Sequence, residues 1–219
     1  IFLVLGVAFG SAIGAAFALR VPMTDMPQLV ALFNGFGGAA SIFVAAAELF
    51  KGQMNAHEVN GVQVPSAHDA LLATALSGLI GAVTFWGSLI AFAKLQELKQ
   101  FKKPFSFNGQ KLVNAGLLLL TILLSAVLAF DPGYGTSIAL YVLLCLFASA
   151  LGLLLVSPIG GADMPVVIAL LNSYSGLAAA ATGFVIDNNV LIIAGSLVGA
   201  SGIILTQLMC KAMNRSLTN

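Results

Sequence analysis

Long apolar stretches alternate with short polar ones along all 219 residues of the chain. A helix needs about 20 apolar residues to cross the ~30 Å hydrocarbon core of a bilayer, and each stretch comes close to that length. Runs this long exclude an outer-membrane β-barrel, whose strands alternate in polarity over about 10 residues. The pattern predicts seven membrane-spanning helices, at residues 1–19, 29–50, 70–92, 112–130, 137–156, 166–186 and 190–210.

Two of these segments are nearly copies of each other. The motif Asp-Met-Pro occurs at 25–27 and again 138 residues later at 163–165, and each copy is followed after the same interval by an asparagine, Asn34 and Asn172. Both asparagines lie inside an apolar run. A polar side chain inside the membrane is energetically costly, so its occurrence at the same place in both copies of a duplicated helix favours a functional role over an incidental one.

The likeness extends to the neighbouring segments, so the chain is predicted to contain a parallel three-helix repeat. Segments four apart in an up-and-down chain point the same way, which gives the two copies one orientation. We expect repeat A at 1–93, a spacer helix at 112–130 and repeat B at 137–219. The predicted fold is an all-α polytopic membrane protein that forms one transmembrane domain over residues 1–219.

The composition agrees with this fold. Hydrophobic residues make up 59% of the chain and charged residues 8%, whereas an ordinary soluble domain has about 25% charged residues. Too few charges are present to cover a water-facing surface, so a lipid bilayer is the expected surrounding of the chain.

The basic residues are predicted to lie almost entirely on one side of the membrane. With seven spans, the loops at 20–28, 94–111 and 157–165 and the C-terminus share one face, which we expect to be cytoplasmic because Lys and Arg are enriched on that side. Nucleic-acid binding is not expected, because no aromatic or structured binding module accompanies the lysines. This face carries eight of the nine basic residues: Arg20, Lys94, Lys99, Lys102, Lys103, Lys111, Lys211 and Arg215.

Asn34 and Asn172 are the main candidate functional residues. Each lies seven residues after a proline at a helix start, hence about 10 Å below the cytoplasmic interface at 1.5 Å per residue, and we expect both to be buried. An amide donates and accepts hydrogen bonds at once, so it can hold a water chain or an imidazole. The alternative is a structural bond to a facing helix, worth about 1 kcal/mol. Ser88 is a further candidate because its span places it at a similar depth.

Three glycines form a stripe on the last span, and a second glycine pair precedes the repeated motif. Gly195, Gly199 and Gly202 fall on one helix face, where tight packing is the simpler interpretation and a narrow hydrated path the alternative. Gly160 and Gly161 give the loop before Asp163 a hinge through which a soluble partner could push on the helix. Asp163 itself is expected to cap that helix.

The familiar signatures of catalysis are missing from the sequence. It has no dinucleotide-binding loop after a strand, no phosphate-binding loop, no metal-ligand cluster and no nucleophile with a base. We therefore expect no catalytic, cofactor-binding or metal site in this chain alone.

Three segments carry a resemblance to a known family. They read Gly-Gly-Ala-Asp-Met-Pro-Val-Val at 160–167, Leu-Asn-Ser-Tyr-Ser-Gly at 171–176 and Met-Cys-Lys-Ala-Met-Asn-Arg-Ser at 209–216. The chain resembles the beta subunit of the proton-translocating, Re/Si-specific nicotinamide nucleotide transhydrogenase. In that family, hydride moves between NAD(H) and NADP(H) in two soluble domains and is coupled to proton passage through a membrane domain. The resemblance implies that this chain is the membrane part, lacking the earliest beta-subunit helices, with an NADP(H)-binding domain expected after residue 219.

The resemblance also assigns roles to residues of this sequence. It implies proton-pathway positions at Asn172 and Ser88, a gating stripe at the three glycines of the last span, and coupling to the NADP(H) domain at Asp163 with its glycine pair. Many members have a titratable histidine where this sequence has Asn34, and an amide cannot replace it because it does not titrate near neutral pH.

The partners follow from the same resemblance. The alpha subunit's membrane helices are expected to supply a histidine facing Asn34 and Asn172. The complete alpha-beta unit is expected to form a homodimer in the bacterial cytoplasmic membrane.

Two other classes remain possible on the sequence. A secondary transporter or proton-channel subunit would share parallel repeats and polar residues near the membrane midplane, but a transporter usually needs a substrate-sized cavity and coupling charges. A purely structural anchor would not need a duplicated buried asparagine.

Overall fold

The computed structural model describes residues 2–51, 67–99, 101, 104–130 and 134–214. Within these ranges all regular structure is helical, which confirms the all-α part of the predicted fold. Each of the seven predicted segments overlaps one α-helix. The α-helices are α1 (Phe2–Arg20), α2 (Met26–Lys51), α3 (Ala67–Leu95), α4 (Gln110–Ala129), α5 (Tyr134–Val156), α6 (Met164–Val185) and α7 (Asn189–Ala212).

Six of these helices are long and apolar enough to cross a membrane, from α2 through α7. Helix α1 is also apolar almost throughout and is 19 residues long. The chain is therefore a multi-pass membrane protein.

The repeated Asp-Met-Pro motif forms the same local structure twice. A short 3-10 helix, η1 (Met23–Asp25) or η2 (Gly161–Asp163), ends at the aspartate and leads directly into α2 or α6. Proline is tolerated in the first turn of each helix because the N–H groups there have no intrahelical acceptor. At the start of α7, the Asn188 side chain accepts a hydrogen bond from the Leu191 backbone N–H at 3.0 Å.

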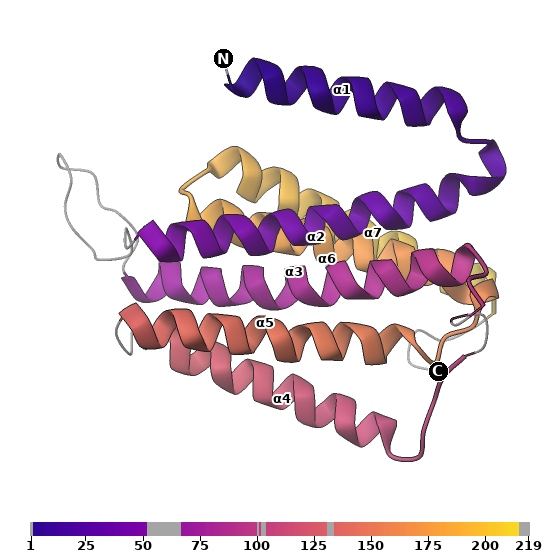
Figure 1. Ribbon diagram of the computed structural model, residues 1–219. Coiled ribbons are helices and arrows are strands. Elements are labelled where there is room, and N and C mark those ends of the chain that lie inside the picture. The colour runs from indigo at the N-terminus through magenta and orange to yellow at the C-terminus, as the bar shows by residue number, and fades with distance from the viewer. Residues whose placement is uncertain (1, 52–66, 100, 102–103, 131–133, 215–219) are drawn as a thin grey trace.

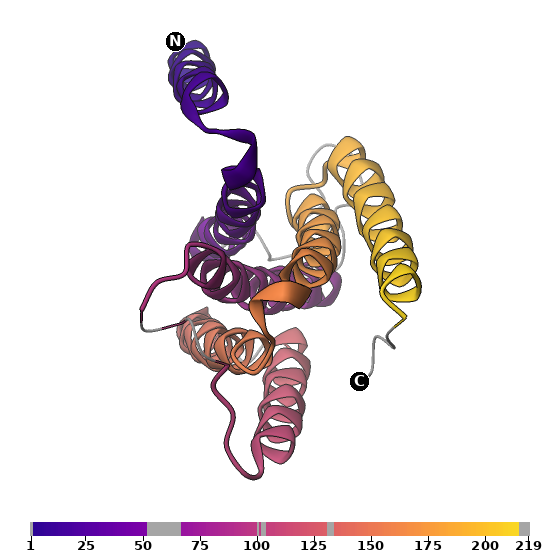
Figure 2. The same cartoon turned by 90° about the vertical axis from the view of Figure 1, so that its right-hand side faces the viewer.

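Consecutive helices run in opposite directions, as Figure 1 shows. Helix α3 lies at the centre and contacts α2, α4, α5 and α6, while α6 also packs against α2 and α7. Helix α1 lies apart from the other helices along most of its length (Figures 1 and 2) and comes near α2 at its C-terminal end, where the Phe17 ring meets the Phe33 ring edge to face at 6.1 Å between centroids.

Most basic residues of the described chain gather at one end of this bundle. Helices α1, α3 and α7 end there with Arg20, Lys94 and Lys211 in their last turns, and α4 begins there beside Lys111 (right-hand side of Figure 1). We call this the basic end. Lys51 closes α2 at the opposite end. The assignment of the basic end to the cytoplasm stays a prediction. Three further basic residues, Lys102, Lys103 and Arg215, lie outside the described residues.

An apolar cluster fills the junction of α2, α3, α5 and α6 near the basic end. Its fully or nearly fully buried members include Ala31, Ile90, Val156, Met164 and Leu171. The cluster matters for the site because Asn34 follows Ala31 by one turn on α2. The polar residues described next therefore lie next to this apolar cluster, on the side away from the basic end.

Candidate functional site

Three polar side chains meet where α2, α3 and α6 cross. The Asn34 amide donates from Nδ2 to Ser88 Oγ at 2.9 Å, and the Ser175 hydroxyl donates to Asn34 Oδ1 at 2.6 Å. Asn34 is 8% exposed and Ser88 is 1% exposed. The structure thus brings together two predicted site residues, Asn34 and Ser88, and adds Ser175, which was not among the predicted site residues.

The chemistry of this triad is that of a neutral hydrogen-bond relay. An amide has both a donor and an acceptor side, and here each side is used, with a hydroxyl as its partner. Such a group can connect a hydrogen-bond donor on one side to an acceptor on the other, but it cannot itself bind and release a proton near neutral pH. A titratable group must come from elsewhere if protons pass this way.

Asn172 lies differently from its repeat partner. Whereas Asn34 is buried, Asn172 is exposed on the surface of this chain, so the expectation that both are buried is wrong for Asn172 here. Helical geometry gives the reason. At 100° per residue, Asn172 falls between Ser175, which faces α2, and Gly176, which faces α7. It therefore lies on the strip of α6 between its two flanking helices, α2 and α7.

The glycine stripe of α7 packs directly on α6. A Cβ added at Gly195 would lie 2.5 Å from the Ala180 nitrogen, and one at Gly202 would lie 2.8 Å from the Ser173 Cβ. At Gly199 the nearest neighbour would be Leu177, at 3.0 Å. All three glycines are buried, so atoms of α6, and not solvent, fill the space beside them in this chain.

Ser173 ties the two helices together within this contact. Its hydroxyl donates to the Gly199 carbonyl at 2.7 Å, and the side chain is fully buried. Ser173 therefore stabilises the contact between α6 and α7 by a buried hydrogen bond. Removal of its hydroxyl would leave the Gly199 carbonyl without that donor.

The loop before α6 has open space around its glycines. Neither Gly160 nor Gly161 would bring an added Cβ within 4 Å of another group, and Gly160 has an ordinary φ of −74°. Asp163 occupies the N-cap position of α6, but its side chain makes no capping hydrogen bond, unlike the expectation from sequence. The next residue, Met164, is fully buried and anchors the helix start.

A second polar layer lies two turns further from the basic end. Ser77 Oγ lies 2.7 Å from Thr182 Oγ1 and 3.1 Å from the Ser41 carbonyl oxygen. Ser41 contributes only its backbone carbonyl. Thr182 follows Ser175 by seven residues, two turns of α6, and that spacing is the sequence signal that could have found the layer.

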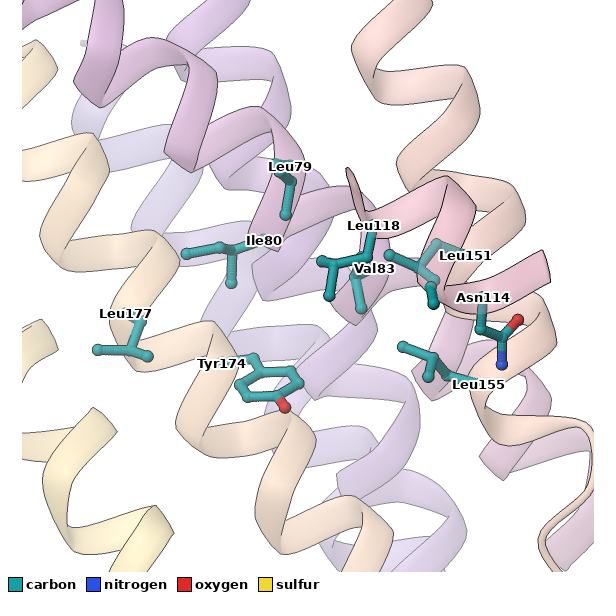
Figure 3. Close-up of a pocket in the computed structure, with 10 residues that line it drawn as sticks. Leu79, Ile80, Val83, Asn114, Leu118, Leu151, Leu155, Tyr174 and Leu177 are labelled. Atoms are coloured by element: carbon teal, nitrogen blue, oxygen red, sulfur yellow. The ribbon is translucent and has the colours of Figure 1, made fainter. Parts of the chain in front are cut away.

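A cavity of about 390 Å³ lies elsewhere, between α3, α4, α5 and α6 (Figure 3). Tyr174 and Leu177 form one side of it, and Asn114 and Leu155 the other. No predicted site residue lines it, and neither does any charged side chain. An apolar space of this kind does not favour the transporter alternative, which needs polar or charged groups to hold a substrate and a coupling ion. In the described part of the chain, no group of three or more His, Cys, Asp or Glu residues is placed to hold a metal ion.

The sequence of the chain matches a known protein family. The sequence model of the family described as "NAD(P) transhydrogenase beta subunit" matches residues 1–219. A protein named "NAD(P) transhydrogenase subunit beta" from Rhodospirillum rubrum is 47% identical over 220 aligned residues, and a strain of the same species gives the same match. Each alignment covers 100% of this chain and 45% of the relative, so the chain spans less than half the length of these proteins.

Proposed function

Because the chain belongs to the NAD(P) transhydrogenase beta subunit family, we propose that residues 1–219 form the proton-translocating membrane domain of such an enzyme. The complete enzyme would transfer hydride between NAD(H) and NADP(H) in soluble domains, with Re/Si specificity. This chain carries the proton movement coupled to that transfer and has no hydride-transfer site of its own.

The observation that carries the proposal is the buried triad of Asn34, Ser88 and Ser175. An amide without partners in an apolar interior costs several kcal/mol, which is why it is kept only where it is fully bonded. Here the bonds come from two other helices, α3 and α6. A change in the position of either helix therefore breaks or makes a hydrogen bond at Asn34, as a gate requires.

The exposed Asn172 supports a partner helix at the strip between α2 and α7. We propose that a membrane helix of the alpha subunit covers this strip and supplies a histidine that faces Asn172 and the Asn34 side of the triad. That imidazole would bind and release the proton, and the amides and hydroxyls would hold it and its water partners. The soluble NAD(H)- and NADP(H)-binding domains complete the unit, which would form a homodimer in the bacterial cytoplasmic membrane.

Matching glycine contacts support the parallel repeat. An added Cβ at Gly38 would lie 2.7 Å from the Gly81 carbonyl oxygen, and the equivalent Gly176 meets the backbone of Gly199. Gly176 follows Gly38 by the repeat interval of 138 residues. The α2–α3 and α6–α7 pairs thus use corresponding glycines for their closest approach, and we propose that they descend from one duplicated unit.

Coupling to the nucleotides is proposed to run through the loop at 157–165. The redox state of NADP(H) in the soluble domain would shift this loop between two positions, and the loop would pull on α6. Since Ser175 of α6 holds Asn34, the shift would reach the triad. A two-state element biased by a ligand at one site and read at another is what linkage requires.

The test is proton pumping by the complete enzyme in reconstituted vesicles. Replacement of Asn34 or Asn172 by Leu is expected to abolish proton uptake and to slow the coupled hydride transfer. Asn114→Leu is the matched control, because it removes an amide from another membrane helix outside the triad, and it is expected to pump normally. Unchanged pumping by both Asn34→Leu and Asn172→Leu would overturn the proposal.

A further inference from the structure

Lys94, in the last turn of α3, is 7% exposed although it is a lysine. Its ammonium group donates to three backbone carbonyl oxygens of the α5–α6 connection: Val156 at 3.0 Å, Ser157 at 2.5 Å and Ile159 at 2.6 Å. An ammonium has three N–H donors, so this cage satisfies all of them. A buried lysine held in this way is a specific arrangement, because the charge is costly to bury unless its hydrogen bonds are complete.

The three acceptors lie at the C-terminal end of α5 and just beyond it. The last carbonyls of a helix lack intrahelical partners and carry the negative end of the helix dipole, so a cation there is favourable. Lys94 therefore caps α5, but it does so from a different helix. Its backbone belongs to α3, so the cap also fixes α5 to α3.

The cage ends just before the glycine pair. Ile159, the last residue held by Lys94, directly precedes Gly160 and Gly161, around which space is open. The loop thus has a root fixed by Lys94, followed by two glycines with open space where a side chain would be. Lys94 also follows Ser88 by six residues on the same helix, about 9 Å at 1.5 Å per residue.

Other groups hold the same end of α5 without this link. Gln110 at the start of α4 donates from Nε2 to the Leu154 carbonyl at 2.8 Å, and the Phe105 N–H donates to the Ser157 carbonyl at 3.1 Å. Neither is charged, and neither comes from α3. These contacts secure the end of α5, so the distinctive contribution of Lys94 is the connection between the loop root and the helix that carries Ser88.

We propose that Lys94 is a positioning residue for energy coupling: it holds the root of the α5–α6 loop against α3, so that movement of the loop beyond Gly160 is delivered to α6 relative to Ser88. This inference rests on the function proposed above. It assigns Lys94 no contact with a proton or a nucleotide. Without the hydrogen bonds from Lys94, residues 156–159 would move together with the rest of the loop. The movement would then not change the position of α6 relative to Ser88.

The first test measures the ratio of protons pumped to hydrides transferred by the complete enzyme in vesicles. We expect Lys94→Met to lower this ratio at least about fivefold, the lower end of typical coupling between linked sites, while hydride transfer continues. Lys94→Arg keeps the charge and the donors and is expected to restore most of the ratio. Should Lys94→Met fail to accumulate in the membrane, Lys94→Gln, which retains two donors, carries the test.

Two control variants separate coupling from general stability. Gln110→Leu removes a hydrogen bond at the same end of α5, and Lys99→Met removes an exposed charge five residues further on. Both are expected to keep the normal ratio, even if Gln110→Leu lowers the yield. A Lys94→Met enzyme with reduced yield but a normal proton-to-hydride ratio would make Lys94 a structural cap only and would overturn the inference.

The second test reads the loop directly. Ala162 is exposed just after the glycine pair, and an Ala162→Cys variant can be labelled with a water-soluble maleimide, with labelling of the parent enzyme subtracted. We expect the labelling rate to depend on bound NADP(H) and Lys94→Met to remove that dependence. Failure of the broader proposal would appear as normal pumping by both Asn34→Leu and Asn172→Leu, whereas failure of this inference would appear as an unchanged ratio and unchanged nucleotide dependence in Lys94→Met.

Discussion

The Asn34 amide donates to the Ser88 hydroxyl over 2.9 Å, across 54 positions of sequence and between two helices. The same amide accepts from Ser175 of a third helix at 2.6 Å. Asn34 is therefore the only side chain of this triad that touches both others, and the predicted effects of mutation follow from that central place.

The bond between Asn34 and Ser88 should be measurable as a coupling energy. A double-mutant cycle built from Asn34→Ala and Ser88→Ala removes each partner singly and together. Hydrogen bonds between membrane helices average about 0.6 kcal/mol and reach ~1.7, so we expect a coupling in that range. The measurement is denaturation of the purified complete enzyme in detergent. A coupling of zero would mean that the two side chains do not share a bond in the assembled enzyme.

Ser175→Ala is expected to weaken the assembly and to lower proton pumping. The substitution leaves the buried Asn34 Oδ1 without its side-chain donor, which costs about 1–3 kcal/mol for a buried polar atom. Denaturation and pumping in vesicles provide the two readouts. Ser201→Ala is the matched control, because that serine is exposed and bonds to the Val198 carbonyl of its own helix. Equal behaviour of the two variants would remove Ser175 from the site.

Gly176→Ala is expected to destabilise the α6–α7 pair. Its new methyl group would meet the backbone of Gly199 and the Gly195 carbonyl oxygen at 2.8 Å, and backbone cannot move aside as a flexible side chain can. Overpacking of this kind costs about 1–3 kcal/mol. Gly116→Ala in α4 is the control, since nothing lies within 4 Å of its added Cβ, and alanine there should stabilise the helix by about 0.5–1 kcal/mol. The midpoints of thermal denaturation should move in opposite directions.

The fold was largely predictable from the spacing of apolar runs. Each predicted segment overlaps a helix because a length of about 20 apolar residues leaves few other structures in a bilayer. How the helices pack was not predictable in the same way, because hydrophobicity in lipid does not say which face meets which neighbour.

The repeat marked Asn34 and Asn172 and a matching depth pointed to Ser88, but neither signal showed how these side chains are placed. Asn34 was found because Asn172 repeats it, yet the repeat also suggested equal burial, and the structure buries only Asn34. Ser175 was missed because the equivalent position of the first copy is Gly37, so no duplication pointed to it. Lys94 looked like one topology lysine among several, since nothing local in the sequence shows that three carbonyls of another helix surround its ammonium.

The exposed face of Asn172 leads to a prediction about the assembled enzyme. In the beta chain alone, an Asn172→Cys variant should react readily with a thiol reagent, because the side chain is exposed between the helices that flank α6. In the complete enzyme we expect an alpha-subunit helix to cover it, so the labelling rate should fall steeply, because the reagent cannot reach a thiol buried between helices. A second cysteine, placed in the alpha subunit next to that histidine, should then form a disulfide with the cysteine at position 172 under mild oxidation. Val198→Cys, on an exposed face of α7, is the control and should label equally in both preparations. Unprotected labelling of Asn172→Cys in the complete enzyme would mean that no partner helix lies over this strip and that the titratable group must come from another direction.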